Sequence, residues 1–400
     1  TRHCCLYWHE LLACFHYDIS LQQTFKKTPT QYLMKTTPTP KLLLLWDRMG
    51  DYHRARWQAL SQLIGADNCL AADYGTGDEL YQWENTRQSD KYFCLVAKPV
   101  EEVGAWEAFS AFRQLVKAQN ITHVCIPGYG RPAYILMLLW ARLKGLKVLM
   151  FAESWYAGNR LVDWAKGLLI SATADVCFVS GKRAAAHFSQ RLGFPAKRII
   201  EGYSVVDNQH FAHRKSEAAA SAKPQLLCVA RHAPEKNLGL LIDAFKQSHL
   251  AYTWQLRIVG GGPLKENLSQ QIGDSDVLLD DWLPYGALPD MYAAATCFIL
   301  PSSFEPWGLV VNEAMAAGLP IILSDAVGAL PDLLTTENGW SFNHNSVADC
   351  VRCLNQVAAT SPDKLSQMGK RSKSIINSFD CFSWASTLKN AFFTINTQFK

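Results

Sequence analysis

Short apolar runs alternate with longer amphipathic segments along this chain from Lys41 onward. Such alternation is typical of βαβ units, in which a buried strand precedes a helix that covers the sheet. In the first half we expect strands at residues 41–46, 91–97, 123–128, 147–153 and 174–180. The helices between them are expected at residues 52–65, 101–119 and 132–145. Parallel strands with intervening helices predict a doubly wound sheet.

The alternation restarts after a small, polar, proline-terminated stretch near residues 212–224. New strand segments begin at residues 225, 254, 277, 297 and 320. The chain is therefore predicted to be an α/β protein with two doubly wound, Rossmann-like domains that face a central cleft. We place the domains at residues 41–215 and 225–384, the linker at 216–224, and at 385–400 a helix that crosses back to the first domain.

Residues 1–40 precede the first strand and show no convincing hydrophobic period. The first part lacks the basic start, apolar core and cleavage site of a signal peptide. Met34 then opens a polar, proline-containing lead into the first strand. We therefore expect the native protein to begin at Met34 and the residues before it to be upstream or disordered sequence.

The composition indicates the class of protein but not its activity. Hydrophobic residues make up 49% of the chain and charged residues 18%, as in a packed globular enzyme. The net charge of +4 does not demand nucleic acid, but it suits an anionic ligand or an anionic membrane surface. The 12 cysteines lie mostly in apolar runs, which indicates reduced thiols in a cytoplasmic protein. No apolar run is long enough to predict a transmembrane helix.

The stretch SSFEPWGLVVNEAMAAGLP, residues 302–320, places two glutamates around a turn. An apolar strand precedes it, and a helix is expected to begin near Gly308 and to end before Gly318. The first amide groups of that helix form an anion site. Glu305 lies in the turn and Glu313 inside the helix, where each could bind neutral hydroxyls of a sugar or ribose beside a phosphate. The alternative is a structural helix with a solvated Glu313.

The run from Glu305 to Glu313, EPWGLVVNE, resembles the E-x7-E motif of the retaining glycosyltransferases of family 4, which have the GT-B fold. The resemblance covers most of the chain from Lys41 to about Trp384, with its most specific motifs in the second half. Further similar segments occur at residues 202–211, 229–245, 257–268 and 283–302.

The resemblance implies a role for each motif residue. Glu313 would hold the ribose of a nucleotide sugar, and Glu305 would contact the transferred sugar. Main-chain groups of Trp307, Gly308 and Leu309 would lie beside the sugar and diphosphate.

Two cations in the loop RHAPEKN, Arg231 and Lys236, match the pair that the family places on the diphosphate. Cations and oriented amides stabilise the charge that a departing diphosphate gains in the transition state. The alternative for these two residues is a solvated polar loop.

Other candidates carry weaker motifs. Gly260 and Gly261 would permit a tight turn near the nucleotide, whose base would lie against the backbone of residues 280–284. Gly50 occupies the place of the family's glycine loop near the donor phosphate, although this sequence has one glycine there rather than a pair.

Two further residues are candidates for contacts with the acceptor or the sugar. Glu153 stands where many members carry a catalytic histidine, so that histidine's role is not carried over. Arg54, with Arg56 nearby, could bind an anionic acceptor or lipid headgroups, and a solvated helix face is the alternative.

No metal site is expected. Asp274 and Asp276 follow a polar helix rather than a buried strand, and Cys350 and Cys353 have no second ligand pair at zinc-site spacing. The resemblance implies a metal-independent reaction with no cofactor, in which a nucleoside diphosphate sugar is the co-substrate.

The resemblance thus implies a retaining hexosyltransferase that uses a UDP-hexose, or as second choice GDP-mannose. The acceptor would be a glycan or a lipid-linked glycan in polysaccharide or glycolipid assembly, and the partners include no nucleic acid. The expected location is the cytoplasm, with peripheral contact to the inner face of the membrane as an alternative. Front-face attack would need no enzymic nucleophile. The competing interpretations are a GT-B nucleotide-sugar epimerase or hydrolase, and a non-catalytic nucleotide-sugar-binding subunit.

Overall fold

The computed structural model describes residues 40–77, 89–212 and 223–398. The predicted N-terminal segment up to residue 39 and most of the predicted linker lie outside these residues. The first sheet has seven parallel strands in the order β3-β2-β1-β4-β5-β6-β7. Its strands are β1 (Leu42–Trp46), β2 (Cys69–Asp73), β3 (Tyr92–Cys94), β4 (His123–Ile126), β5 (Lys147–Ala152), β6 (Val176–Val179) and β7 (Ile199–Glu201).

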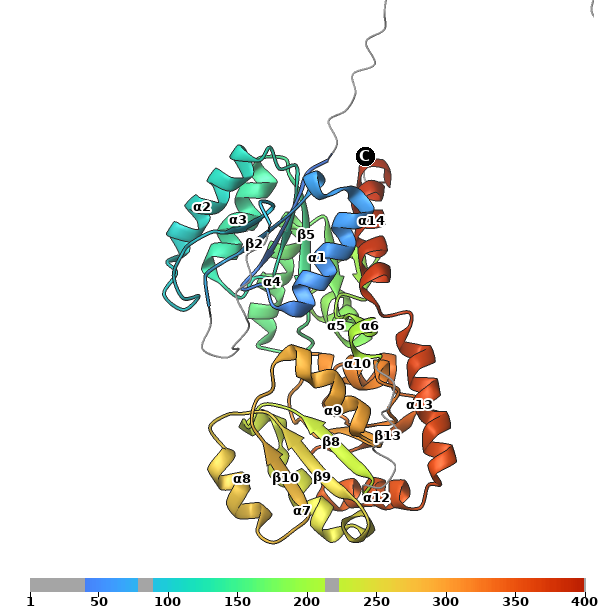
Figure 1. Cartoon of the computed structure of the whole chain (residues 1–400). Helices are drawn as coiled ribbons and strands as arrows, with labels where there is room; N and C mark the ends of the chain where they lie inside the picture. Colours follow the sequence, from blue (N-terminus) through green and yellow to red (C-terminus); the bar gives the residue numbers. More distant parts are fainter. Residues whose placement is uncertain (1–39, 78–88, 213–222, 399–400) are drawn as a thin grey trace, which may run out of the picture. The chain divides into compact units, whose positions relative to one another are not determined.

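Helices cover both faces of the first sheet, each with its own apolar cluster (Figure 1). One face packs against α2 (Ala105–Ala118), α3 (Pro132–Leu143), α4 (Arg160–Thr173) and the short α5 (Lys182–Ala186). The opposite face packs against α1 (Asp51–Ile64) and α14 (Cys381–Gln398). Strands buried on both sides explain the nearly continuous apolar runs of the sequence.

The second sheet has six parallel strands in the order β10-β9-β8-β11-β12-β13. They are β8 (Gln225–Val229), β9 (Gln255–Val259), β10 (Val277–Asp280), β11 (Cys297–Leu300), β12 (Ile321–Ser324) and β13 (Gly339–Phe342). The chain reaches this sheet after the short α6 (Asn208–Phe211). The helices of this half are α7 (Leu238–Gln247), α8 (Lys265–Ile272), α9 (Leu288–Ala294), α10 (Leu309–Ala316), α11 (Leu330–Leu333), α12 (Val347–Ala358) and α13 (Pro362–Ile376).

The last helix completes the first domain. It begins at Cys381, before the predicted boundary at residue 385. Trp384, Leu388 and Phe392 are buried in the same cluster as the strands of the first sheet. The indole of Trp384 lies 5.9 Å from the ring of Phe178, measured between ring centroids. The chain therefore runs through both domains and returns to cover a face of the first one.

Three strands and several helices escaped the sequence analysis. The missed strands are β2, β7 and β13, and the longest of the missed helices are α4 and α13. Strands β7 and β13 lie at the edges of their sheets and are three and four residues long, too short for a clear period. Strand β2 contains two alanines, and its pairing with β1 rather than strong β propensity makes it a strand.

Candidate active site

A cavity of about 990 Å³ lies at the carboxyl ends of strands from both sheets. Two loops from the second sheet contribute Arg231 after β8 and Gly260 after β9, and Glu153 follows β5 of the first sheet. Parallel strands bring their carboxyl ends to the same edge, which is where α/β proteins bind ligands. All predicted site residues line this cavity except Gly50 and Gly261.

The turn before α10 depends on Gly308. Its φ of 96° and ψ of 69° lie in the left-handed region, and a Cβ there would come within 3.0 Å of the Leu300 side chain. Helix α10 begins at the next residue, Leu309, so its first amide groups have no partner within the helix. This end of α10 lines the cavity and offers positive partial charge to an anion there.

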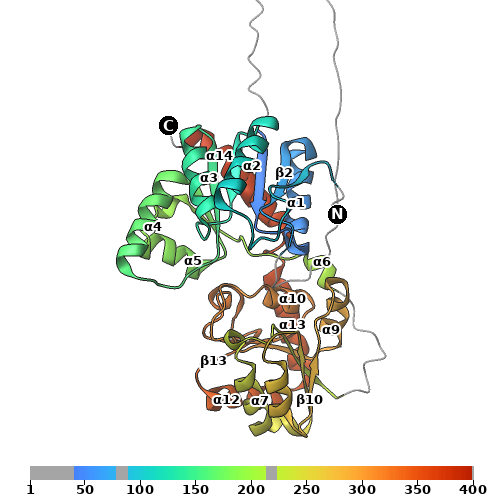
Figure 2. The same ribbon diagram turned by 90° about the vertical axis from the view of Figure 1, so that its left-hand side faces the viewer.

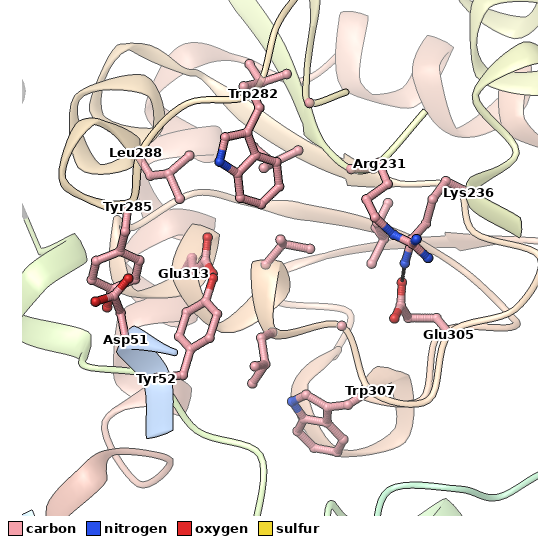
Figure 3. Close-up of a pocket in the computed structure, with 18 of the residues that line it drawn as sticks. Asp51, Tyr52, Arg231, Lys236, Trp282, Tyr285, Leu288, Glu305, Trp307 and Glu313 are labelled. Carbon is pink, nitrogen blue, oxygen red and sulfur yellow. Dashed lines mark hydrogen bonds and ion pairs between the residues drawn. The ribbon is translucent and has the colours of Figure 1, made fainter. Parts of the chain in front are cut away.

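Glu305 and Lys236 form an ion pair on the cavity wall (Figure 3). Lys236 Nζ donates to Glu305 Oε2 at 2.5 Å, and Ser302 Oγ donates to the same oxygen at 3.2 Å. The backbone of Glu305 is held as well, because its N–H donates to the Tyr156 hydroxyl and its carbonyl accepts from the Trp155 indole. Glu305 is buried and therefore fixed in one orientation.

Arg231 lies beside this pair in Figure 3. Its Nη2 donates to Glu235 Oε1 at 2.5 Å, and both side chains stay partly exposed. The short 3-10 turn Pro234–Lys236 carries Glu235 and Lys236 to the cavity. The structure thus brings two cations and two carboxylates together at one end of the cavity.

Glu313 lies away from this charged cluster and beside Tyr52 (Figure 3), and its carboxylate accepts hydrogen bonds from two tyrosines. Tyr52 donates to its Oε1 at 2.5 Å, and Tyr292 donates to its Oε2 at 2.6 Å. Burial raises the pKa of Glu313 to about 6, although the two tyrosine hydrogen bonds act in the opposite direction. The alternative of a solvated Glu313 is wrong, because the side chain is fully buried.

Backbone packing between two loops explains the glycines after β9. Gly260 has a φ of 153°, and a Cβ there would lie 2.1 Å from the carbonyl oxygen of Ala230. Gly262 has a φ of 146° and would place a Cβ 2.7 Å from the carbonyl oxygen of His232. Gly261, between them, accepts a hydrogen bond from the His232 amide at 2.7 Å. The glycines thus let the loop after β9 touch the loop that carries Arg231.

Trp307 is buried, and its indole donates to Asn312 Oδ1 at 2.9 Å. Its indole therefore holds the turn against α10.

The sequence analysis singled out the backbone of residues 280–284 but did not name the Trp282 side chain. Trp282 lines the cavity together with Tyr285 and Leu288 (Figure 3). An aromatic residue in a polar loop is the signal that could have found Trp282.

The first domain contributes fewer polar groups. Ser204 Oγ donates to Glu153 Oε1 at 2.7 Å, which orients that carboxylate at the cavity. Arg54 also lines the cavity, with its Nη1 3.7 Å from an oxygen of Asp51. Gly50 precedes α1 and accepts the amide of Arg54 within the first helical turn.

The alternative of a solvated helix face is wrong for Arg56. This side chain is buried, and its Nε and Nη2 donate to the carbonyl of Val205 at 3.0 and 2.7 Å. Its guanidinium also lies over the ring of Tyr203, 5.0 Å from the centroid. Arg56 therefore anchors α1 to the segment after β7, because a buried guanidinium needs its donors satisfied.

Two segments were rejected as metal motifs, and in the structure Asp276 of the first has an ion-pair partner while Cys350 and Cys353 of the second are buried thiols. Asp276 accepts from Lys223 and Gln255 at 2.7 and 2.8 Å. Burial raises the pKa of the Cys350 thiol to about 12 and that of Cys353 to about 11. Within residues 40–77, 89–212 and 223–398, no three His, Cys, Asp or Glu side chains come together as a metal site. In the same part of the chain, no helix is long and apolar enough to span a membrane.

The second half of the chain is similar to a known protein family. Residues 209–375 match the family described as glycosyl transferases group 1. A sulfoquinovosyl transferase of Arabidopsis thaliana is 34% identical over 139 residues, which cover 33% of this chain and 26% of that protein. The chain thus spans about a quarter of that relative's length.

A second relative aligns over a longer stretch. The GDP-mannose-dependent alpha-(1-6)-phosphatidylinositol monomannoside mannosyltransferase of Mycolicibacterium smegmatis is 24% identical over 281 residues, which cover 65% of this chain and 73% of that protein. Among solved structures, HepE of Anabaena in complex with UDP-glucose superposes with a TM-score of 0.69 and 15% identity, over 88% of this chain and 99% of that one. The predicted GT-B fold of two Rossmann-like domains is confirmed.

Proposed function

We propose that this chain, whose residues 209–375 match the group 1 glycosyl transferases, transfers a sugar from a nucleoside diphosphate donor to a glycan or lipid-linked acceptor. The transfer would retain the configuration of the anomeric carbon. The observation that carries this proposal is the division of the cavity into a charged end with Arg231 and Lys236 and a tyrosine-capped carboxylate at Glu313. A charged diphosphate fits the first, and neutral hydroxyls fit the second.

The charged end of the cavity, with Arg231 and Lys236, would stabilise the leaving diphosphate. When the sugar leaves, negative charge builds on the diphosphate oxygens, and preorganised donors stabilise that charge more than they stabilise the bound donor. Arg231, Lys236 and the free amides at the start of α10 are the groups that face this position. Because these groups supply the positive charge, we propose that the reaction needs no metal ion and no further cofactor.

The end of the cavity with Glu313 would recognise the nucleoside of the donor. A carboxylate accepts hydrogen bonds, so Glu313 would hold ribose hydroxyls. Trp282 offers an aromatic face to the base, which would lie against residues 280–284 beside Gly260 and Gly261. HepE was solved with UDP-glucose, and the mycobacterial relative is named as GDP-mannose-dependent. We therefore keep a UDP-hexose as first choice and GDP-mannose as second.

Glu305 and main-chain groups of Trp307, Gly308 and Leu309 would contact the transferred sugar. Glu305 already accepts from Lys236 and Ser302, so its charge is compensated and its remaining lone pairs can accept from sugar hydroxyls. We assign no nucleophile: the acceptor would attack from the face that the diphosphate leaves, and a diphosphate oxygen would take its proton. Glu153, oriented by Ser204, and Arg54 are the proposed contacts to the acceptor or the sugar.

A donor panel tests this proposal. We expect one nucleoside diphosphate sugar to raise the melting temperature of the full chain in the presence of a chelator, and to be turned over when acceptors are added. Binding by no member of the panel would contradict the proposal. Conversion of the donor without any acceptor would instead support an epimerase or hydrolase, and binding without turnover by any acceptor would support a non-catalytic subunit.

Donor binding is expected to weaken as the pH falls through about 6, where burial places the pKa of Glu313. Protonation removes the charge that strengthens its hydrogen bonds to ribose. The folded-state pKa is raised above the ordinary 4.5, so ionisation of Glu313 also lowers the stability of the fold as the pH rises through that range. Binding of an intact nucleotide sugar, whose diphosphate diester does not titrate there, measures the first effect. The step should vanish in Glu313→Gln, and a step that persists in that variant would assign it to another group.

A further inference from the structure

The outer face of α4 carries apolar side chains where a solvated helix normally carries polar ones. Leu161, Trp164 and Leu168 are 77%, 64% and 54% exposed. Together with the exposed Ala165 and Ala172 they recur at the spacing that lines one side of a helix. We call these five residues the α4 stripe. Contiguous exposed apolar surface of this kind marks an interaction site.

Contacts on the buried side of α4 fix the orientation of the helix. The α4 stripe is therefore its solvent-exposed side and does not belong to the core. Asp163 is buried, and its Oδ2 accepts from Arg191 Nε at 2.7 Å and from the Gly158 amide at 3.0 Å. Gly167 packs so closely that a Cβ there would lie 1.8 Å from the carbonyl oxygen of Leu192. These contacts fix the rotation of α4 and leave its apolar stripe in solvent.

The neighbouring helices extend the same surface. Helix α3 contacts both α2 and α4, and all three lie on the same side of the first sheet (Figures 1 and 2). Trp106 on α2 and Leu139 and Leu143 on α3 are also exposed. We call the α4 stripe and these three residues the α2–α4 surface.

Positive charge is concentrated in the same part of the chain. Residues 131–198 hold eleven Lys and Arg against three Asp and Glu, whereas the whole chain has a net charge of only +4. The three acids are not free on the surface: Glu153 lines the cavity, Asp163 is buried, and Asp175 accepts from the Val148 amide at 2.8 Å. Lys144 and Arg160 are exposed cations on this part of the chain. Arg142 and Lys182 are exposed as well, but Arg142 pairs with Asp175 at 3.4 Å and Lys182 lies 4.0 Å from Asp332.

We propose that the α2–α4 surface docks on an anionic lipid bilayer. The stripe residues Leu161, Trp164 and Leu168 would enter the headgroup region, and the surrounding Lys and Arg would bind lipid phosphates. A second copy of this chain is a poorer occupant, because a two-fold interface would place the same basic surface against itself. This inference goes beyond the proposed function, and its test uses no donor or acceptor.

Vesicle co-sedimentation of the full chain tests the proposal. We expect binding to vesicles of phosphatidylcholine with phosphatidylglycerol, weaker binding at high salt, and little binding to phosphatidylcholine alone. The triple variant Leu161→Gln, Trp164→Gln, Leu168→Gln should bind at least about tenfold less. Because these side chains are exposed, its unfolding transition should stay near that of the unmodified protein. Equal binding by this variant would overturn the proposal.

Two further variants provide a control for the apolar groups and a separate test of the basic residues. Tyr252→Gln with Phe382→Gln removes equally exposed apolar groups elsewhere and should leave vesicle binding unchanged. Lys144→Gln with Arg160→Gln should weaken binding to anionic vesicles by at least about tenfold. A self-association that the triple variant abolishes, with no vesicle binding by the unmodified protein, would assign the surface to a second copy and overturn the proposal.

Discussion

Replacing Lys236 by alanine is expected to lower kcat by roughly 10²–10³-fold, the usual effect of losing one preorganised donor at a developing anion. The side chain lies at the charged end of the cavity, where the leaving diphosphate would gain its charge. The variant leaves Glu305 with Ser302 as a remaining partner, so we expect the free energy of unfolding to fall by only about 1–3 kcal/mol. Steady-state turnover and chemical unfolding measure the two effects separately.

The control is Lys223→Ala, which breaks another lysine ion pair of the second half, to Asp276, outside the cavity. It should leave turnover within about twofold of the unmodified enzyme, since surface ion pairs contribute little. A purely structural role of Lys236 would give a different pattern: turnover would fall only as far as the folded fraction of the variant falls. Such a parallel loss of turnover and fold would contradict the assignment of Lys236 to the diphosphate.

Glu313→Gln is expected to weaken donor binding by about 100-fold, since hydrogen bonds to a charged acceptor are worth about 1.5–3 kcal/mol each. The amide has nearly the same shape and can still bond to the hydroxyls of Tyr52 and Tyr292, so the fold should persist. The effect should appear in Kd and KM more than in kcat, the reverse of the Lys236 variant. Calorimetry with the nucleotide sugar and steady-state kinetics measure it.

Glu337→Gln is the matched control, because this exposed carboxylate pairs only with Arg371 at 2.8 Å among the contacts described for it. It should bind the donor as the unmodified protein does. An unchanged Kd in Glu313→Gln would show that the ribose does not contact this carboxylate. A loss of folding in that variant would be visible in the unfolding transition before any binding is measured.

The sheets were largely predictable because parallel strands buried on both faces appear as apolar runs. Strand β1 and strand β11 are such runs, and both are completely buried. Strand β2 was not predictable in this way, since its sequence CLAAD has weak β propensity and acquires its conformation from pairing with β1 and β3. Its neighbours, rather than its own residues, decide that it is a strand.

The sequence by itself determined the local parts of the site. The turn at Gly308, the start of α10 and the short turn before Lys236 follow from nearby residues, and the glutamate spacing carried the family resemblance. Tertiary structure alone decided that Glu313 is buried and that Tyr52 caps it from 261 residues away. The physical reason is that backbone turns depend on adjacent residues, whereas burial, pKa and hydrogen-bond partners depend on elements brought together only when the domains fold.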